Sequence, residues 1–510
     1  MIEIDGHHLS IENVVAVSRD MEKVGISTSG MENILRVRGW LEDILASGKA
    51  VYGINTGFGV FSEKRISPQD STTLNRNLIL SHAVGTGPAL EEEIVRAAML
   101  VRANTLAKGY SGVRPEIVQT LLDMLNAGVT PVVPSQGSLG SSGDLSPLSH
   151  LVLVMATDEY DRPEESGWAT FQGKVLRGKE AMETAGLTRL VLGPKEGLAL
   201  NNGATFSAAL AALVVHDALA LARVAEIALS MSLEAQMGCS AAFDERLNAV
   251  RGQDGQMRVA NSVHKLISGS TLVDCAGRVQ DAYSLRCAPQ VQGAVWDSID
   301  YCARIVEREI NAATDNPLLF SATEALSGGN FHGEPVALVM DFMGIALSEL
   351  ASISERRIYR LTDGSSNAGL PPMLVDSPEA AGLNSGLMMP QYTAASLVLE
   401  NQTLAHPDSV HSLPTSAGQE DHNANAMTAA RHARQILENT RHVLAIELYT
   451  AARALDLRLK QKPKASIGAG TREAYLKIRS VVPYQPGDAL WGPEIEMVHR
   501  LIKSGAFRDI

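Results

Sequence analysis

The residues of this chain with the most unusual chemistry are two serines between glycines, in the run Gly140-Ser141-Ser142-Gly143-Asp144. Most Ser/Gly stretches are surface loops, and that interpretation requires no chemistry. A hydrolase elbow would need G-x-S-x-G, but the residue two positions after Ser142 is Asp144. A phosphate-binding loop would need a lysine at a set position, and a metal site would need Cys or His ligands. The run contains neither.

The same run is suited to a reaction on its own backbone. If the chain bends sharply here, the amide nitrogen of Gly143 can attack the carbonyl carbon of Ser141 and close a five-membered ring. Glycine suits the attacking position because it has no Cβ to crowd the ring. Loss of water completes an imidazolinone, and dehydration of Ser142 leaves an exocyclic methylene. That methylene is an electrophile that no ordinary side chain provides.

The composition limits what such a site acts on. The chain has 510 residues, of which 45% are hydrophobic and 20% charged, so it can bury a large core. Its 44 Lys and Arg against 57 Asp and Glu give a net charge of -13, which disfavours nucleic acid as a partner. The basic run from Arg458 to Lys464 is short, and we expect it to be a solvated face.

Neither the first residues nor the most apolar segment indicates a membrane protein. MIEIDGHHLS has no cationic stretch followed by an apolar run, so we expect no signal peptide. Charged residues interrupt the segment from Ala204 to Met231, which falls short of the uninterrupted run of about 18 residues that a membrane span needs. We therefore expect a soluble, cytoplasmic protein. The cysteines have no CxxC spacing and are expected to be reduced thiols: Cys239, Cys275, Cys287 and Cys302.

Hydrophobic periodicity predicts the elements that position the serines. In the first part of the chain we expect a strand at Ile2 to Ile4 and helices at Glu32 to Ala46, Leu90 to Ala107 and Pro115 to Ala127. Long helices are expected at Ala204 to Gln236, Ala288 to Ala313, Pro335 to Leu361, Gln391 to Leu404 and Ala426 to Leu455. Helices longer than the usual length of about 11–12 residues typically form bundles. We expect an N-terminal region at 1–200 and a long-helix bundle with a C-terminal helical region at 201–510.

Seven further motifs occur over nearly the whole chain: Tyr52 to Gly59, Ser81-His82-Ala83, Gly137 to His150, Glu196 to Leu200 with Asn202-Gly203, Gln280 to Cys287, Gly328 to His332, and Gln419 to His422. In this order they resemble the histidine and aromatic amino acid ammonia-lyases. That family forms a methylidene-imidazolinone (MIO) group from a triad that is usually Ala-Ser-Gly. Here the triad is Ser141-Ser142-Gly143, and its first residue contributes only its backbone carbonyl, so we expect serine to permit cyclisation.

The resemblance implies the architecture and the cofactor. The fold is expected to be mainly α, like the fumarase/aspartase (L-aspartase-like) superfamily, with a long central helical bundle. Ala-rich helix faces are compatible with the homotetramer of that family, in which several subunits share each active site. The MIO group forms autocatalytically, so no external cofactor is expected. We also expect no metal, because the 13 histidines include no HExxH pattern.

The resemblance also implies the mechanism. The substrate amine attacks the methylene derived from Ser142, and Tyr52 matches the base that removes the β-proton. Because a phenol has an ordinary pKa of about 10, this base needs its anion stabilised. Gln280, Tyr283 and Arg286 are spaced i, i+3, i+6, so a helical turn can bring them together. Arg286 matches the fork that holds the substrate carboxylate, Tyr283 a tyrosine near the electrophile, and Gln280 a positioning residue. We expect Arg286 and Tyr283 to be partly buried.

Substrate choice depends mainly on His82 and Glu420. A carboxylate can accept a hydrogen bond from an imidazole N–H, whereas it is a costly unpaired charge against a phenyl ring. Both motifs resemble the histidine branch, although the run Asn423-Ala424-Asn425 departs from its pattern. Asn202 matches an asparagine that bonds near the imidazolinone and the carboxylate, and Phe331 is expected to line the pocket.

The sequence thus predicts that L-histidine is converted to ammonia and trans-urocanate, as in histidine degradation. Three alternatives remain open: an aminomutase on the same scaffold, a tyrosine ammonia-lyase, and a catalytically silent assembly or binding member.

Overall fold

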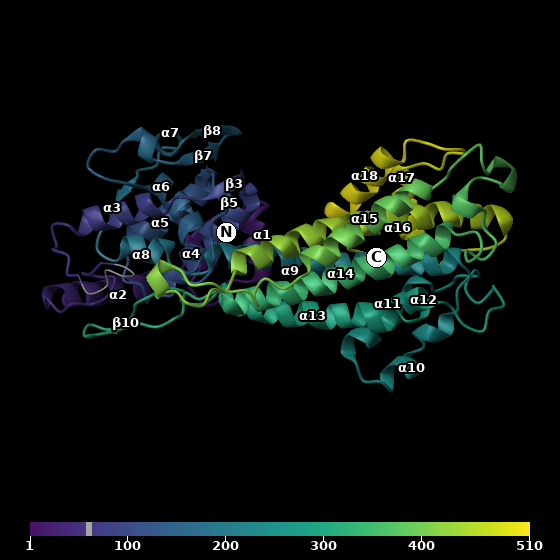
Figure 1. The fold of residues 1–510 in the computed structure, drawn as a ribbon, viewed down its shortest axis with the longest axis horizontal. Helices are drawn as coiled ribbons and strands as arrows, with labels where there is room; N and C mark the ends of the chain where they lie inside the picture. The colour runs from purple at the N-terminus through teal and green to yellow at the C-terminus, as the bar shows by residue number, and fades with distance from the viewer. Residues whose placement is uncertain (58–63) are drawn as a thin grey trace. The chain divides into compact units, whose positions relative to one another are not determined.

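The structure is a computed structural model that describes residues 1–57 and 64–510; Phe58 and Gly59 of the glycine-rich motif lie outside these residues (Figure 1). The described chain divides into two compact units. Unit 1 comprises residues 1–216, 302–341 and 407–431, and unit 2 comprises residues 217–301, 342–406 and 432–510. The expected division into regions 1–200 and 201–510 stays a prediction.

The long helices agree with the hydrophobic periodicity to within a few residues at most ends. They are α9 (Thr205–Ala235), α13 (Ala288–Glu309), α14 (Glu334–Thr362), α15 (Met388–Leu404) and α16 (Ala426–Gln461). The strands are short, and the sheets formed by the described residues have two or three strands each. The chain is therefore mainly α, as expected.

Unit 1 is built from shorter elements, together with parts of the long helices. These elements are β1 (Ile2–Ile4), α1 (Ile11–Ser18), β2 (Val24–Ile26), α2 (Thr28–Ala46), α3 (Ser71–His82), β3 (Thr86–Ala89), α4 (Glu92–Ala107), α5 (Pro115–Ala127), β4 (Thr130–Pro131), β5 (Pro134–Gln136), α6 (Leu145–Met155), β6 (Ala156–Thr157), β7 (Trp168–Phe171), β8 (Lys174–Arg177), α7 (Gly178–Thr184), β9 (Leu190–Val191), α8 (Glu196–Asn201), β10 (Leu318–Ser321) and β11 (Glu324–Leu326). Strands β1 and β2 pair in parallel, whereas β4, β7 and β8 form an antiparallel sheet.

Unit 2 adds five shorter helices to its parts of the long ones: α10 (Glu245–Ala249), α11 (Asp254–Leu266), α12 (Tyr283–Arg286), α17 (Ala469–Val481) and α18 (Trp491–Lys503). The expectation of a solvated basic run holds for Lys460, Lys462 and Lys464, which are exposed, but was wrong for Arg458. Arg458 does not belong to a solvated face, because α16 continues past it and its guanidinium is buried. It donates hydrogen bonds to the backbone carbonyl oxygens of Ala235 at 3.0 Å and of Asn367 and Ala368 at 3.1 Å. The four cysteines are free, as expected.

Two long helices, α9 and α14, are long and apolar enough to span a membrane. In each of them, 72% of the most apolar 18-residue window is buried inside the structure. Burial of this extent is typical of the core helices of soluble proteins, which must be apolar on most sides. The length and apolarity of α9 and α14 are therefore explained by their packing within the protein.

A buried arginine fixes the segments around the site in unit 1. Arg102 lies in the middle of α4, where every residue from Ile94 to Ala107 is buried. Its guanidinium donates to the carbonyl oxygen of Asn202 at 2.6 Å, to Thr205 Oγ1 at 2.7 Å and to Thr314 Oγ1 at 3.0 Å. Burial lowers its pKa to about 10, which still leaves the group charged near neutrality. Arg102 thus holds the junction between α8 and α9, where Asn202 and Gly203 lie.

Candidate active site

A cavity of about 1270 Å³ lies in unit 1 and collects most of the residues that the sequence singled out. The predicted site residues that line it are Tyr52, His82, Ser141, Ser142, Asn202, Phe331 and Glu420. They come from segments far apart in the chain: the turn after α2, the end of α3, the loop before α6, the end of α8, and two loops on either side of α14 and α15. Gly143 lies directly behind the lining.

At two positions the loop that carries the serines has a backbone conformation that favours glycine. Gly140 and Gly143 have φ values of +71° and +82°, in the left-handed region. A Cβ on Gly143 would lie 2.0 Å from the carbonyl carbon of Gly203, so no side chain fits there. The two segments are also hydrogen-bonded: Gly203 N–H donates to the carbonyl of Ser142 at 3.1 Å, and Asp144 N–H donates to the carbonyl of Gly203 at 2.9 Å.

Asp144 anchors the end of this loop to the first turn of α9. Its carboxylate is fully buried and accepts hydrogen bonds from Ser138 Oγ at 2.7 Å, Ser207 N–H at 2.8 Å and Ser207 Oγ at 2.9 Å. Burial raises its pKa, while these hydrogen bonds act in the opposite direction. The loop that carries the serines is therefore held by hydrogen bonds to Gly203 and to Ser207 without a bound substrate.

Glu420 receives both serine hydroxyls of the triad. Ser142 Oγ donates to Glu420 Oε1 at 2.6 Å, and Ser141 Oγ donates to Oε2 at 3.0 Å. The Asn423 amide in turn donates to Ser141 Oγ at 3.1 Å. Thr415 pairs with Glu420 through backbone hydrogen bonds and also donates its hydroxyl to Oε2 at 3.3 Å. Two of the departures from the family motifs, Ser141 and Asn423, are thus direct partners.

His82 and Asn202 add polar groups to the same cavity. Burial lowers the pKa of His82, while a hydrogen bond to the Leu78 carbonyl and the charge of Glu420 oppose the change. Asn202 donates its side-chain amide to the carbonyl of Ser142 at 3.1 Å. Within the part of the chain that the structure describes, its buried Oδ1 has no hydrogen-bond partner. The cavity therefore offers an acceptor oxygen that a hydrogen-bond donor can satisfy.

Two histidines at this cavity were missed by the sequence reasoning. His332 and His422 line it, their rings stack with centroids 5.9 Å apart, and His332 Nε2 lies 3.1 Å from the carbonyl oxygen of His422. The sequence feature that could have identified them is their position in the motifs Gly328 to His332 and Gln419 to His422. Lys64 and Asn316 also line the cavity, and nothing in the local sequence pointed to them.

Gln280, Tyr283 and Arg286 do not join this cavity. All three belong to unit 2, and none of them lines it. Helix α12 contains only residues 283–286, so Gln280 precedes the turn. Arg286 stacks over the Tyr283 ring at 4.6 Å and donates from Nε to the Asp281 carbonyl at 2.8 Å. Tyr283 is 69% exposed, so the expectation of partial burial was wrong for this residue, whereas Arg286 is half-buried, as expected. Gln280 is exposed.

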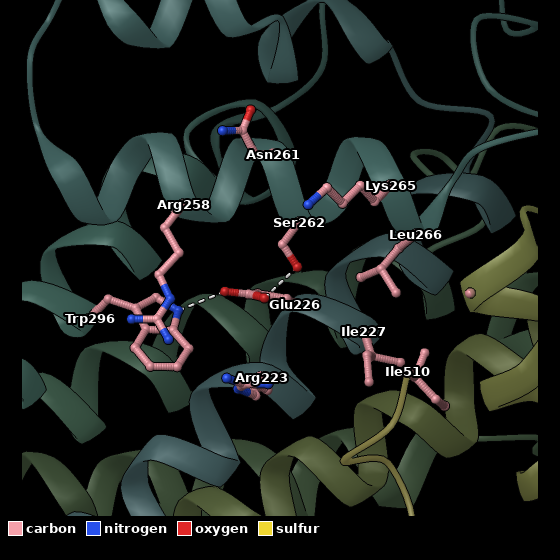
Figure 2. A pocket seen from close by; sticks show the side chains of 11 residues that line it. Arg223, Glu226, Ile227, Arg258, Asn261, Ser262, Lys265, Leu266, Trp296 and Ile510 are labelled. Atoms are coloured by element: carbon pink, nitrogen blue, oxygen red, sulfur yellow. Dashed lines mark hydrogen bonds between the residues drawn. The ribbon is translucent and has the colours of Figure 1, made fainter.

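A second cavity, of about 440 Å³, lies in unit 2 and contains none of the predicted site residues (Figure 2). Its buried Glu226 accepts hydrogen bonds from Trp296 Nε1 at 2.6 Å and from Ser262 Oγ at 2.5 Å. Arg258 stacks over the Trp296 ring at 3.4 Å. Burial raises the pKa of Glu226. Because both oxygens of Glu226 already have partners, this arrangement is satisfied without a ligand.

Known proteins resemble the chain over its whole length. A family model described as aromatic amino acid lyase matches residues 9–480. The chain belongs to this family. A histidine ammonia-lyase from Caldanaerobacter subterraneus subsp. tengcongensis is 49% identical, over 100% of this chain and 98% of its own. The chain is therefore a carbon–nitrogen lyase. The family resemblance that the motifs predicted is confirmed.

Solved structures agree with this assignment. A tyrosine aminomutase from Streptomyces globisporus is 33% identical, with a TM-score of 0.93 over 100% of this chain and 98% of its own. A histidine ammonia-lyase from Trypanosoma cruzi is 37% identical, with a TM-score of 0.90 over 100% of this chain and 94% of its own. These matches confirm the expected fumarase/aspartase-like helical fold of the lyase.

The lowered pKa of His82 predicts how this residue titrates. Its ring should take up a proton only below pH 6.5, the ordinary value. As the pH falls below that value, the unfolded chain binds the proton more readily than the folded one, so the contribution of His82 destabilises the protein in acid. NMR of ¹³C-labelled histidine, with His82→Gln to assign the signal, measures the midpoint. A midpoint at or above pH 6.5 would contradict the burial of the ring.

Proposed function

We propose that this lyase eliminates ammonia from L-histidine to give trans-urocanate, as a soluble cytoplasmic enzyme of histidine degradation. The observation that carries the proposal is the position of Glu420, which contacts both triad serines and acts electrostatically on His82 within one cavity. A carboxylate there can accept a hydrogen bond from the imidazole N–H of the substrate, but it would be an unpaired charge against a phenyl ring. The names of the similar proteins support the same substrate.

We propose that Ser141, Ser142 and Gly143 cyclise to the MIO group, with its dehydroalanine-type methylene, without an external cofactor. The Gly143 nitrogen adds to the Ser141 carbonyl carbon, and one water leaves to form the ring C=N bond. Ser142 then loses its Cα proton and its hydroxyl as a second water. The residues fit this group because Gly143 has no room for a Cβ and Asn202 Oδ1 is buried with no partner among the described residues.

The surroundings of Ser142 favour that second dehydration. Gly203 N–H and the Asn202 amide both donate to the Ser142 carbonyl oxygen, which carries negative charge when the Cα proton leaves. Donors fixed in advance on such an oxygen stabilise the charge as it develops. Glu420 contacts the departing hydroxyl at 2.6 Å and is placed to exchange a proton with it.

The remaining roles belong to residues of the same cavity. When formed, the MIO group supplies an electrophile that makes the substrate amine a better leaving group. Tyr52 is the proposed base for the β-proton. Glu420 and His82 hold the imidazole, Asn202 accepts a hydrogen bond from the bound substrate or the group beside it, and Phe331 packs against the ring.

We propose that Gln280, Tyr283 and Arg286 complete a cavity in another copy of the chain within a homotetramer. Two observations support this: the three residues do not line the cavity of unit 1, and Tyr283 is largely exposed. Exposed apolar patches mark surfaces for association. Helices α14 and α15 carry several exposed large apolar side chains within unit 2: Phe342, Ile345, Tyr392 and Leu399.

The substrate proposal is tested by assaying L-histidine, L-tyrosine and L-phenylalanine in parallel, with Glu420→Gln and Ser142→Ala as variants. We expect urocanate from histidine, a fall in kcat of at least about 100-fold in Glu420→Gln, and no turnover in Ser142→Ala. Mass spectrometry should find that the wild-type triad peptide is lighter than its sequence mass by two waters. The Ser142→Ala peptide should not show this loss of two waters. If β-histidine is the main product, the protein is an aminomutase and the proposal is wrong. Faster turnover of tyrosine than of histidine would identify a tyrosine ammonia-lyase instead. An unmodified triad would identify a catalytically silent member.

The contact of Ser141 with Glu420 and Asn423 predicts a separable effect. Ser141→Ala should still lose two waters, because only the backbone carbonyl takes part in cyclisation. It removes one hydrogen bond from the Glu420 carboxylate, which corresponds to a fall of about 10- to 100-fold in kcat/KM for histidine. The double variant with Asn423→Ala should lose little more, because the two residues act as a pair. Additive losses would show that Asn423 acts independently of Ser141.

Shared active sites predict complementation between inactive variants. Ser142→Ala lacks the electrophile and Arg286→Ala lacks the carboxylate clamp, so each homo-oligomer should be inactive. Co-expressed chains with different affinity tags should form mixed oligomers that contain some intact sites and regain part of the wild-type rate. Co-expressed Ser142→Ala and Tyr52→Phe chains are the matched control, because both changes lie in the same cavity lining. No gain over this control would exclude sharing through Arg286.

A further inference from the structure

Two histidines and a glutamate of unit 2 form a cluster outside the proposed reaction site. His442 lies on α16, and Glu496 and His499 lie one turn apart on α18. One ligand atom from each residue can be chosen so that all three atoms lie within 4.8 Å of one another. His442 Nε2 is 3.7 Å from Glu496 Oε2, and His499 Nδ1 is 3.5 Å from Glu496 Oε1. These distances are too long for hydrogen bonds.

The tautomer of His442 is set by the backbone. Its Nδ1 lies 3.0 Å from the carbonyl oxygen of Glu438, which can only accept, so Nδ1 carries the proton. In the neutral ring, Nε2 then presents a lone pair on the side of Glu496. A lone pair and a carboxylate repel each other unless a proton or a metal ion lies between them. A histidine whose second nitrogen donates to a backbone carbonyl is the usual arrangement around a bound metal ion.

His499 is the more confined of the two rings. It is only 7% exposed, and neither ring nitrogen has a hydrogen-bond partner among residues 1–57 and 64–510. Its Nδ1 is on the side of Glu496, and its Nε2 lies 3.8 Å from Glu438 Oε2. Glu438, which is also paired with Arg441, would have to approach by a few tenths of an ångström to accept the Nε2 proton, and Nδ1 would then be free as a ligand. A buried polar ring without partners is otherwise unfavourable.

The spacing of the three ligand atoms suits one small ion. A tetrahedral zinc ion with bonds of about 2.0–2.1 Å holds its ligand atoms about 3.3–3.4 Å apart. The two histidine–carboxylate separations are slightly larger: 3.5 Å from His499 Nδ1 to Glu496 Oε1 and 3.7 Å from His442 Nε2 to Glu496 Oε2. One ligand atom from each of the three residues lies within 4.8 Å of the other two, so the side chains must draw slightly closer around an ion. The rings of His442 and His499 stack with centroids 3.9 Å apart and planes inclined by 18°. Ring torsions of histidine are broad, so a modest rotation of each ring turns both lone pairs toward one ion.

We propose that His442, Glu496 and His499 bind one divalent transition-metal ion, with zinc the best match to two imidazoles and a carboxylate. Water completes the fourth position, and the ion links α18 to α16. Tyr449 and Trp491 already bring these helices together, with ring centroids 6.1 Å apart. The expectation of no metal rested on the missing HExxH pattern of a single helix, whereas these ligands come from two helices.

The test uses the full chain, stripped of metal with a chelator and dialysed. Zinc titration followed by calorimetry and by elemental analysis should give one ion per chain and a raised unfolding temperature. Cobalt should give the visible absorption of a tetrahedral site. His442→Gln and His499→Gln should each lower zinc affinity by at least about 100-fold, since loss of a ligand exceeds the 10- to 100-fold effect of outer partners. The matched control, His264→Gln on α11, replaces an exposed histidine and should change neither property.

His442 is partly exposed, so its variant is expected to fold even if the His499 variant does not. The absence of stoichiometric binding would overturn the proposal, as would zinc affinity that is unchanged in His442→Gln. Because none of the three ligands belongs to the proposed reaction, these results are independent of the substrate assays.

Discussion

The close packing of Gly143 against Gly203 is the contact on which the candidate active site depends. Gly203 is itself pressed against the carbonyl oxygen of Thr314, since a Cβ on Gly203 would come within 2.0 Å of it. The segments around Gly143, Gly203 and Thr314, which are far apart in the sequence, therefore meet at a point where there is no room for side chains. Arg102 makes this crossing stable by donating to carbonyl or hydroxyl oxygens of two of the segments from a fully buried position. Charged hydrogen bonds of this kind are among the strongest in proteins.

That crossing determines what the two serines contact. With the loop end anchored through Asp144, Ser142 presents its hydroxyl to Glu420 and its carbonyl to Asn202 and Gly203. The hydroxyl of Ser141, which the chemistry of cyclisation does not require, acquires a role through its contacts with Glu420 and Asn423. One carboxylate is therefore tied to the triad on one side and available to the cavity on the other.

The two units contribute different chemistry. Unit 1 holds the cavity with the triad and the proposed imidazole-binding residues, whereas unit 2 holds the half-buried Arg286, the proposed carboxylate clamp, beside the exposed Tyr283. A clamp outside the cavity of its own unit 1 is consistent with use by another copy of the chain. Unit 2 also contains two buried polar side chains that differ in their partners: both oxygens of Glu226 accept hydrogen bonds, whereas neither ring nitrogen of His499 has a hydrogen-bond partner among the described residues.

The sequence by itself determined the long helices and the family, and it is the source of the proposed triad chemistry. Periodicity located α9 to within a residue at each end, because helix formation depends on local spacing of apolar residues. Seven of the predicted site residues line one cavity, and each belongs to a motif that can be recognised within a short run of the sequence.

Only the tertiary structure decided which of these residues meet. The exposure of Tyr283, the burial of Arg458, the pairing of Ser141 with Asn423 and the cluster around His499 depend on segments that are distant along the chain. Local composition carries no information about such contacts, because a side chain's burial and partners are set by whatever packs against it.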